Sequence, residues 1–201
     1  MSNYAGVEIV ALAAEIVSHL ADHGIEVVVV GGLAVEIYSQ NCYLTKDIDM
    51  VDVSYAKPKT LHAAMAKLGF HKKGRVFENT TTPITVEFPS APLTTGDELI
   101  TETTVIAHEF GNIPIVHARD IVKDRLSAFF HWNDNQSLVQ ALAVMQGHDI
   151  PALDIQAFCI KEAGVNKYYL VASLQAAVKA QAASDMKIIE QLVVDKIIAQ
   201  Q

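Results

Sequence analysis

The sequence lacks the features that mark several large classes of protein. Of its 201 residues only two are cysteines, Cys42 and Cys159, and their separation gives neither a metal-binding spacing nor a disulfide framework. No apolar stretch approaches the length needed to cross a bilayer. The N-terminus lacks a basic region followed by an apolar segment and a small-residue cleavage site. We therefore expect a cytoplasmic protein with reduced thiols and no membrane partner.

Positive charge is also scarce, because 15 Lys and Arg residues stand against 23 Asp and Glu residues and leave a net charge of −8. This balance argues against a general nucleic-acid coat protein but leaves local contact with RNA open. Lys72, Lys73 and Arg75 follow the expected end of a helix. There they would either complement the helix dipole or meet an acidic acceptor such as tRNA.

Apolar residues, in contrast, are plentiful. They make up 51% of the chain, which is enough for a sizeable core and argues against a disordered chain. Internal repeats and low-complexity tails are absent. A chain of 201 residues can form one compact domain with an appended helical part, or two small domains.

The hydrophobic periodicity changes near residue 118. Before it, we expect helices over residues 7–23, 33–39 and 58–68, and strands over residues 25–30, 47–53, 70–77, 83–88, 103–110 and 113–116, the last two as a hairpin. After it, only helical patterns occur, over residues 120–132, 135–146, 154–163, 167–183 and 184–200. The predicted fold class is therefore α/β (α+β), with a mixed sheet and flanking helices in residues 1–117. A C-terminal helical bundle follows in residues 118–201.

The most informative stretch runs from Val27 to Val53. A run of β-branched residues stops at Gly31-Gly32, a short helical segment follows, and the chain returns into Asp47-Ile48-Asp49. Side chains alternate along a strand, so Asp47 and Asp49 share a face, and two like charges that close are costly unless a cation lies between them. The Gly pair leaves backbone N–H groups open to an anion at a helix start. A divalent cation beside a phosphate indicates nucleotide chemistry.

Glu87 is the best candidate for a third carboxylate. It shares a strand face with Thr85, and a strand next to Asp47 and Asp49 would bring it near the same cation. Three carboxylates and phosphate oxygens suit Mg²⁺ (or Mn²⁺) far better than zinc. The predicted reaction is in-line attack of a hydroxyl on the α-phosphorus of a nucleoside triphosphate, with pyrophosphate leaving. Asp47 and Asp49 would bind the metal ions, while Glu87 would help to activate the hydroxyl and accept its proton.

Each of these features also has an ordinary structural interpretation. A Gly pair after a strand is usually a turn, an Asp-x-Asp segment is usually a solvated strand end or a cap, and Glu87 alone would be an exposed strand residue. The three together, in this order and each on a strand or at its edge, favour a nucleotide site. His19 and His23 are spaced to face one zinc ion on a helix, but a solvated helix end explains that pair better.

Three segments resemble the signatures of the DNA polymerase beta-type nucleotidyltransferase superfamily: Gly31-Gly32, Thr45-Lys46-Asp47-Ile48-Asp49-Met50 and Val86-Glu87-Phe88. The similarity covers roughly residues 25–128 and is nearest to the small bacterial minimal and abortive-infection toxin-type nucleotidyltransferases. It implies a nucleotidyltransferase-type sheet, Mg²⁺ or Mn²⁺, and a nucleoside triphosphate as substrate. It also implies that Asp47 and Asp49 are the metal pair, Glu87 the third carboxylate and Gly31-Gly32 the phosphate loop.

The resemblance extends to basic residues, with one departure. Arg125 falls where relatives carry a basic residue on the first helix after the sheet, with Lys123 nearby. Many relatives have Arg two residues before Thr45, and this chain has Tyr43 instead. Lys46 or Arg125 would then have to take over the missing contact with the triphosphate.

The expected function is metal-dependent transfer of a nucleoside monophosphate from a nucleoside triphosphate to a hydroxyl on a protein, an RNA or a small molecule. Tyr43 favours an alternative, in which the chain keeps the fold without catalysis and binds a partner protein, as one half of a toxin–antitoxin-like pair would. A third option is an aminoglycoside-type adenylyltransferase, which needs an acidic pocket for its cationic acceptor.

Overall fold

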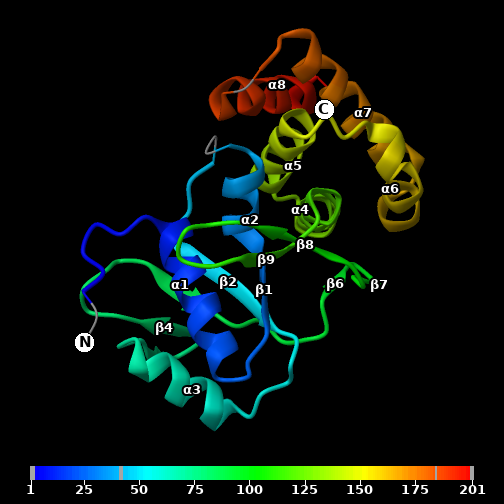
Figure 1. Cartoon of the computed structure of the whole chain (residues 1–201). Coiled ribbons are helices and arrows are strands. Elements are labelled where there is room, and N and C mark those ends of the chain that lie inside the picture. The colour runs from blue at the N-terminus through cyan, green and yellow to red at the C-terminus, as the bar shows by residue number, and fades with distance from the viewer. Residues whose placement is uncertain (1–2, 41–42, 184, 200–201) are drawn as a thin grey trace. The chain divides into compact units, whose positions relative to one another are not determined.

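A computed structural model describes residues 3–40, 43–183 and 185–199, so Cys42 lies outside the described residues. In the described residues the chain forms eight α-helices, a mixed seven-stranded sheet and a small two-stranded sheet (Figure 1). The region after residue 117 is helical. The predicted mixed α/β class with a helical C-terminal region is therefore confirmed. No helix in this part of the chain is both long and apolar enough to cross a membrane.

The chain divides into two compact units, and each is described by itself. The sheet unit consists of Met1–Ala34, Leu44–Thr94 and Leu99–His117, and the helical unit of Val35–Tyr43, Thr95–Glu98 and Ala118–Gln201. The helix α2 (Gly31–Tyr38) starts in the sheet unit and ends in the helical unit. The small sheet of β6 (Thr94–Thr95) and β7 (Glu98–Leu99) likewise takes residues from both units.

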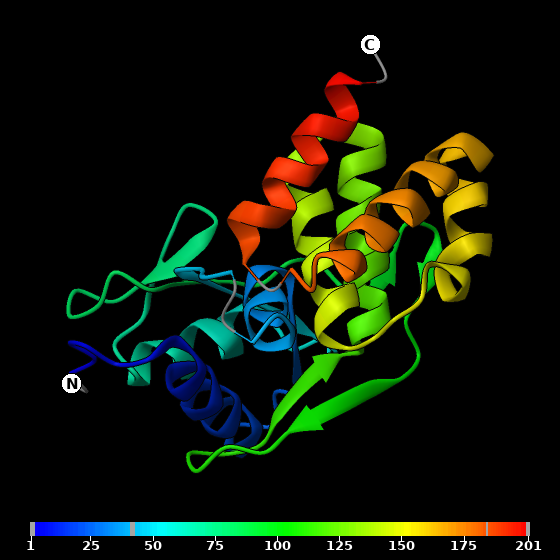
Figure 2. The ribbon, with the colours of Figure 1, turned by 90° about the horizontal axis from the view of Figure 1, so that it is seen from above.

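The large sheet has the strand order β3-β4-β5-β2-β1-β9-β8. Its strands are β1 (Val27–Val30), β2 (Asp47–Asp52), β3 (His71–Lys73), β4 (Val76–Glu78), β5 (Thr85–Glu87), β8 (Thr103–Ile106) and β9 (Ile113–Val116). β1 lies in the interior, antiparallel to β2 and parallel to β9, and its four valines suit that place because both faces of a central strand are covered. β8 and β9 form the expected antiparallel hairpin, drawn in green in Figure 2.

Two helices of the sheet unit pack on one face of this sheet. α1 (Ile9–Asp22) contacts β1, β9 and α3 (Pro58–Lys67), and Figure 1 shows α1 in front of the strands with α3 beside it. α1 buries Leu12, Ile16 and Leu20 completely, a spacing of four residues that keeps the three side chains on one stripe. Pro58 begins α3, where its fixed φ suits the first turn and its missing N–H has no partner to lose.

The expectation of a single strand over residues 70–77 is wrong. The segment forms two strands, β3 and β4, which pair antiparallel with Lys73 opposite Val76. Gly74 adopts φ +63°, a left-handed conformation that lets the chain reverse in a two-residue turn. β4 then pairs with β5, which places Phe77 opposite Val86.

The helical unit is built around α5 (Asn135–Gly147), which has buried side chains throughout residues 137–145. The other helices are α4 (Ala118–Trp132), a 3₁₀ helix (Ala152–Ile155), α6 (Gln156–Ala163), α7 (Val165–Ala180) and α8 (Met186–Ile198). α5 contacts α4, α7 and α8, and Figure 2 shows α8 beside it. The Asp134 carboxylate caps α5 by accepting from the backbone N–H groups of Gln136 and Ser137, at 3.0 and 3.3 Å.

Candidate functional site

The pairing of β2 with β5 brings the predicted carboxylates onto neighbouring strands. The two strands run parallel, with Asp47 opposite Thr85 and Asp49 opposite Glu87. Partners in a parallel register project to the same side of a sheet, so these four side chains share one face, called here the carboxylate face. The Thr85 hydroxyl donates to Asp47 Oδ1 at 2.6 Å and fixes that carboxylate.

The Asp49 carboxylate lies directly against Gly31. β1 pairs with β2 so that Val30 faces Asp49, and Gly31 is the next residue along the chain. A Cβ atom at Gly31 would lie 2.3 Å from Asp49 Oδ2, and Gly31 also adopts φ +62°. Only glycine satisfies both conditions, because any other side chain would strain the backbone and collide with the carboxylate. The Gly31-Gly32 pair therefore holds the start of α2 within contact distance of a predicted metal ligand.

Thr45 and Lys46 lead into β2 beside Asp47. The Thr45 hydroxyl accepts from the backbone N–H of Asp47 at 3.2 Å, and the Lys46 carbonyl accepts from the backbone N–H of Thr85 at 3.1 Å. The second bond extends the β2–β5 ladder by one residue. The side chain of Lys46 is exposed, whereas that of Thr45 is half-buried. Lys46 thus offers an exposed ammonium group on the residue before Asp47.

Glu87 pairs with Arg75, a residue expected from the sequence to complement a helix dipole or to meet an acidic acceptor. Arg75 Nη2 donates to Glu87 Oε1 at 2.8 Å, and Arg75 Nε donates to the same oxygen at 3.1 Å. Arg75 follows Gly74 in the tight turn between β3 and β4, and β4 then pairs with β5 so that Val76 lies opposite Glu87. The sequence signal for this turn is the Gly74-Arg75 step between the basic Lys72-Lys73 and the apolar Val76-Phe77, which is typical of a hairpin.

Arg125 and Lys123 belong to the helical unit, on α4. Arg125 donates through Nε to Asp124 Oδ2 at 2.9 Å, and Lys123 donates to Glu98 Oε2 at 2.7 Å. Both cations are therefore matched with carboxylates of their own unit. The sheet unit by itself brings together Gly31, Asp47, Asp49 and Glu87.

The carboxylate face supplies only oxygen ligands, the donors that Mg²⁺ and Mn²⁺ prefer. The donor types therefore fit the implied metal, and Asp47, Asp49 and Glu87 would be the residues to hold it. Within residues 3–40, 43–183 and 185–199, no group of three or more His, Cys, Asp or Glu side chains is gathered closely enough to bind an ion. Asp47 and Asp49 instead follow one another along β2, and Glu87 lies opposite Asp49 on β5. Thr85 donates to Asp47, and Arg75 donates to Glu87.

Cysteine chemistry is disfavoured at the cysteine that the structure describes. Cys159 is completely buried on α6, and burial raises the pKa of its thiol to about 11. A thiol with that pKa is protonated at neutral pH and is a poor nucleophile. Oxygen ligands on the carboxylate face remain the better candidates for chemistry.

Comparison with known proteins gives no relative from which a function could be transferred. No family model, no curated protein and no solved structure matches the chain.

Proposed function

We propose that the chain is a metal-dependent nucleotidyltransferase, which moves a nucleoside monophosphate from a nucleoside triphosphate to a hydroxyl acceptor. The observation that carries the proposal is the position of Asp49, in register with Glu87 on one side and against Gly31 on the other. Carboxylates, a glycine-paired helix start and an exposed lysine are the groups that triphosphate chemistry requires. The carboxylates share one face of the sheet unit, and Gly31 lies against Asp49, which supports the proposal.

Each residue has a defined role in this reaction. A bound Mg²⁺ or Mn²⁺ ion would act as a Lewis acid on the phosphate oxygens. Asp47 and Asp49 would supply its ligands, and the Thr85 hydroxyl keeps Asp47 oriented. The acceptor oxygen forms a bond to the α-phosphorus, the bond from that phosphorus to the β-phosphate oxygen breaks, and pyrophosphate leaves. Glu87 accepts the proton of the acceptor hydroxyl through Oε2, since Arg75 donates to Oε1.

The triphosphate itself needs contacts that balance its charge. Gly31 and Gly32 start α2, where backbone N–H groups and the positive end of the helix dipole favour an anion. Lys46 adds a point charge beside them. Thr45 positions the first residue of β2. Arg125 belongs to the helical unit, and its phosphate-binding role stays a prediction from the family resemblance.

Isothermal titration of ATP, CTP, GTP and UTP in the presence of Mg²⁺ tests the proposal. We expect wild-type protein to bind at least one triphosphate and the Asp47→Asn/Asp49→Asn variant to lose that binding. Asp22→Asn, an exposed carboxylate at the end of α1, is the matched control and should bind as wild type does. Transfer of an α-phosphate label to an acceptor by the double variant at the wild-type rate would contradict the mechanism.

A second candidate function has one observation in its favour. Arg75 forms an ion pair with Glu87, the third carboxylate. A carboxylate that pairs with a cation of the protein itself fits a chain that has lost metal chemistry. The chain would then be a catalytically silent protein that binds a partner. The same titration separates the two, because wild-type protein that binds no triphosphate with Mg²⁺ or Mn²⁺ would favour the silent protein.

A further inference from the structure

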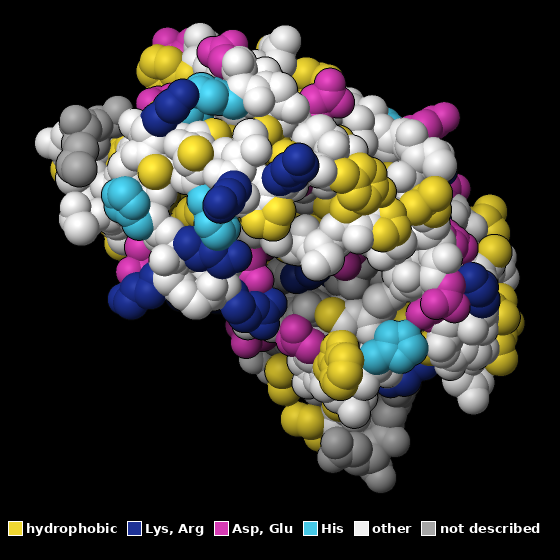
Figure 3. Space-filling model, turned by 90° about the horizontal axis from the view of Figure 1, so that it is seen from below, with side chains coloured by type: hydrophobic (Ala, Val, Ile, Leu, Met, Phe, Trp, Pro, Cys, Tyr) yellow, Lys and Arg dark blue, Asp and Glu magenta, His cyan; other side chains and the backbone are white. Residues whose placement is uncertain are grey.

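Basic residues are concentrated in one short stretch of this acidic chain. Residues 57–75 contain no Asp or Glu, although the chain as a whole carries a net charge of −8. Six of the 15 Lys and Arg residues fall in this stretch: Lys57, Lys59, Lys67, Lys72, Lys73 and Arg75. They lie on or next to α3, β3 and the turn before β4. Figure 3 shows Lys, Arg and His side chains gathered on one side of the surface seen from below.

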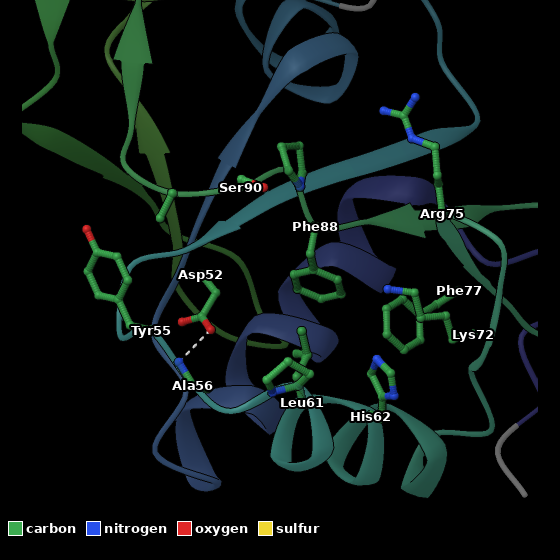
Figure 4. A pocket seen from close by; sticks show the side chains of 13 residues that line it. Asp52, Tyr55, Ala56, Leu61, His62, Lys72, Arg75, Phe77, Phe88 and Ser90 are labelled. Carbon is green, nitrogen blue, oxygen red and sulfur yellow. Dashed lines mark hydrogen bonds between the residues drawn. The ribbon is translucent and has the colours of Figure 1, made fainter.

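The same stretch lines a pocket with aromatic walls. The pocket has a volume of about 330 Å³ and lies entirely within the sheet unit. Phe77 and Phe88 meet edge to face with their centroids 5.4 Å apart, and His62 of α3 stands edge-on to Phe77, also at 5.4 Å. Figure 4 shows the Phe88 ring in the middle of the pocket, with Asp52 and Tyr55 across from it. A half-buried ring in an open pocket is a surface on which a flat ligand can stack.

This pocket lies on the opposite side of the sheet from the carboxylate face. Phe77 pairs with Val86, and Val86 alternates with Glu87 along β5, so Phe77 points away from the Glu87 side. Its contact with His62 identifies the side on which α3 packs, called here the α3 face. The pocket therefore opens on the other side of the sheet from the carboxylates, with Arg75 common to both, since it lines the pocket and donates to Glu87.

The charges at the pocket favour an anionic ligand. Lys72 Nζ lies 5.6 Å from the centre of the Phe77 ring, and Figure 4 shows this amine reaching toward the rings. Asp52 is the one acidic residue in the pocket lining, and its carboxylate accepts from the backbone N–H groups of Ser54 and Ala56 at 2.9 and 2.8 Å. Asp52 thus stabilises a turn, and Lys72 and Arg75 are the Lys and Arg residues of the pocket lining.

We propose that the α3 face binds single-stranded nucleic acid, with one base stacked on Phe88 and a phosphate contacted by Lys72. A basic surface with an aromatic platform is the combination by which single strands are held without reading their sequence. A duplex would be a poorer ligand, because its bases are already stacked and cannot enter the pocket. An acidic peptide would satisfy the lysines but would leave the rings without a flat partner. The proposal goes beyond nucleotidyl transfer and holds with or without that activity.

Fluorescence anisotropy with a labelled oligouridine of about 12 nucleotides tests the proposal over a series of salt concentrations. Wild-type protein should bind at low salt and release the strand as salt rises. Lys72→Glu should weaken binding by about fivefold or more and reduce the salt slope by about 0.7, because one phosphate contact is lost. Phe88→Leu should weaken binding by about fivefold without changing the slope, because a base loses its stacking partner.

The matched control is Lys161→Glu, which makes the same change in net charge at an exposed position of the helical unit. It should leave binding within about twofold of wild type. Thermal unfolding of every variant confirms that it is folded. Failure of wild type to bind at low salt would overturn the proposal, as would an equal loss in the control. Tighter binding of an acidic peptide, or equal binding of a duplex, would also overturn it, the former in favour of a protein partner.

Discussion

The two faces of the large sheet differ in their chemistry. The carboxylate face presents Asp47, Asp49 and Glu87, whereas the α3 face opens into an aromatic pocket lined by Lys72. At the end of β5 the two faces are one residue apart, since Glu87 belongs to the first and Phe88 lines the second. The net charge of the chain therefore describes neither surface, because strand alternation places successive side chains of one segment on opposite faces.

The largest change in stability is expected at Phe77, the buried ring in the lining of the pocket on the α3 face. Phe77 is 1% exposed and contacts both His62 and Phe88. Phe77→Ala should lower the free energy of unfolding by about 3–5 kcal/mol, through lost burial and the cavity left behind. Urea denaturation measures this. Phe110→Ala, at a ring that is 54% exposed in the same unit, is the control and should change the value by about 0.5 kcal/mol or less.

The next effect tests the contact that positions Asp49 on the carboxylate face. Gly31→Ala should destabilise by about 2–4 kcal/mol, because positive φ is strained and the new Cβ meets Asp49 Oδ2. Gly24 is the matched control, since its φ is +70° and a Cβ there would meet nothing within 4 Å. Gly24→Ala should cost only about 1 kcal/mol. Equal costs at the two glycines in urea denaturation would show that the carboxylate does not press on Gly31.

A carboxylate with a purely structural role provides a smaller contrast. Asp134→Ala should lower stability by about 1 kcal/mol at neutral pH, because α5 loses its N-cap. The side-chain hydrogen bond from Ser137 is the main cause of the lowered pKa of Asp134. The folded-state pKa is below the unfolded one, so the stabilisation is complete above the ordinary carboxyl pKa and is lost as pH falls through the folded value. The difference from wild type should shrink below about pH 4, and a constant difference would contradict it.

The smallest expected change is a gain in the free energy of unfolding, at Asp47 on the carboxylate face. Asp47→Asn keeps an oxygen that can accept from Thr85 but removes one of three negative charges on the carboxylate face. We expect stability to rise by about 0.5 kcal/mol, because like charges on adjacent positions repel. The gain should fade as salt screens the repulsion. A loss of more than about 1 kcal/mol in the free energy of unfolding would instead show that Asp47 has a structural role, as Asp134 does.

Local patterns predicted most of the fold. The helices and the strands β1, β2 and β9 follow from periodicity and from stop signals such as Gly24 and Pro58, which act within a few residues. The two-residue turn at Gly74 was missed, because the apolar and basic residues on either side read as one extended segment. The division of residues 154–163 into a 3₁₀ helix and α6 was also missed, since one helical period gives no sign of the change.

The candidate site was predictable in its parts but not in its assembly. Alternation alone places Asp47 and Asp49 on one face, and likewise Thr85 and Glu87. Which strands become neighbours is a long-range matter, so the register of Asp49 with Glu87 and the ion pair of Arg75 with Glu87 had to come from the structure. The roles of Gly32, Thr45, Lys46 and Arg125 toward a nucleotide stay predictions.

The parallel pairing of β2 and β5 also has a consequence for how the protein folds. Parallel strands cannot be joined by a tight turn, and here α3 and the β3–β4 hairpin lie between them. Their contacts join residues far apart in sequence, which close slowly. We therefore expect the β3–β4 hairpin to form before the β2–β5 ladder, so that repulsion between Asp49 and Glu87 begins only when that ladder closes. A variant that relieves this repulsion should slow unfolding more than it speeds folding.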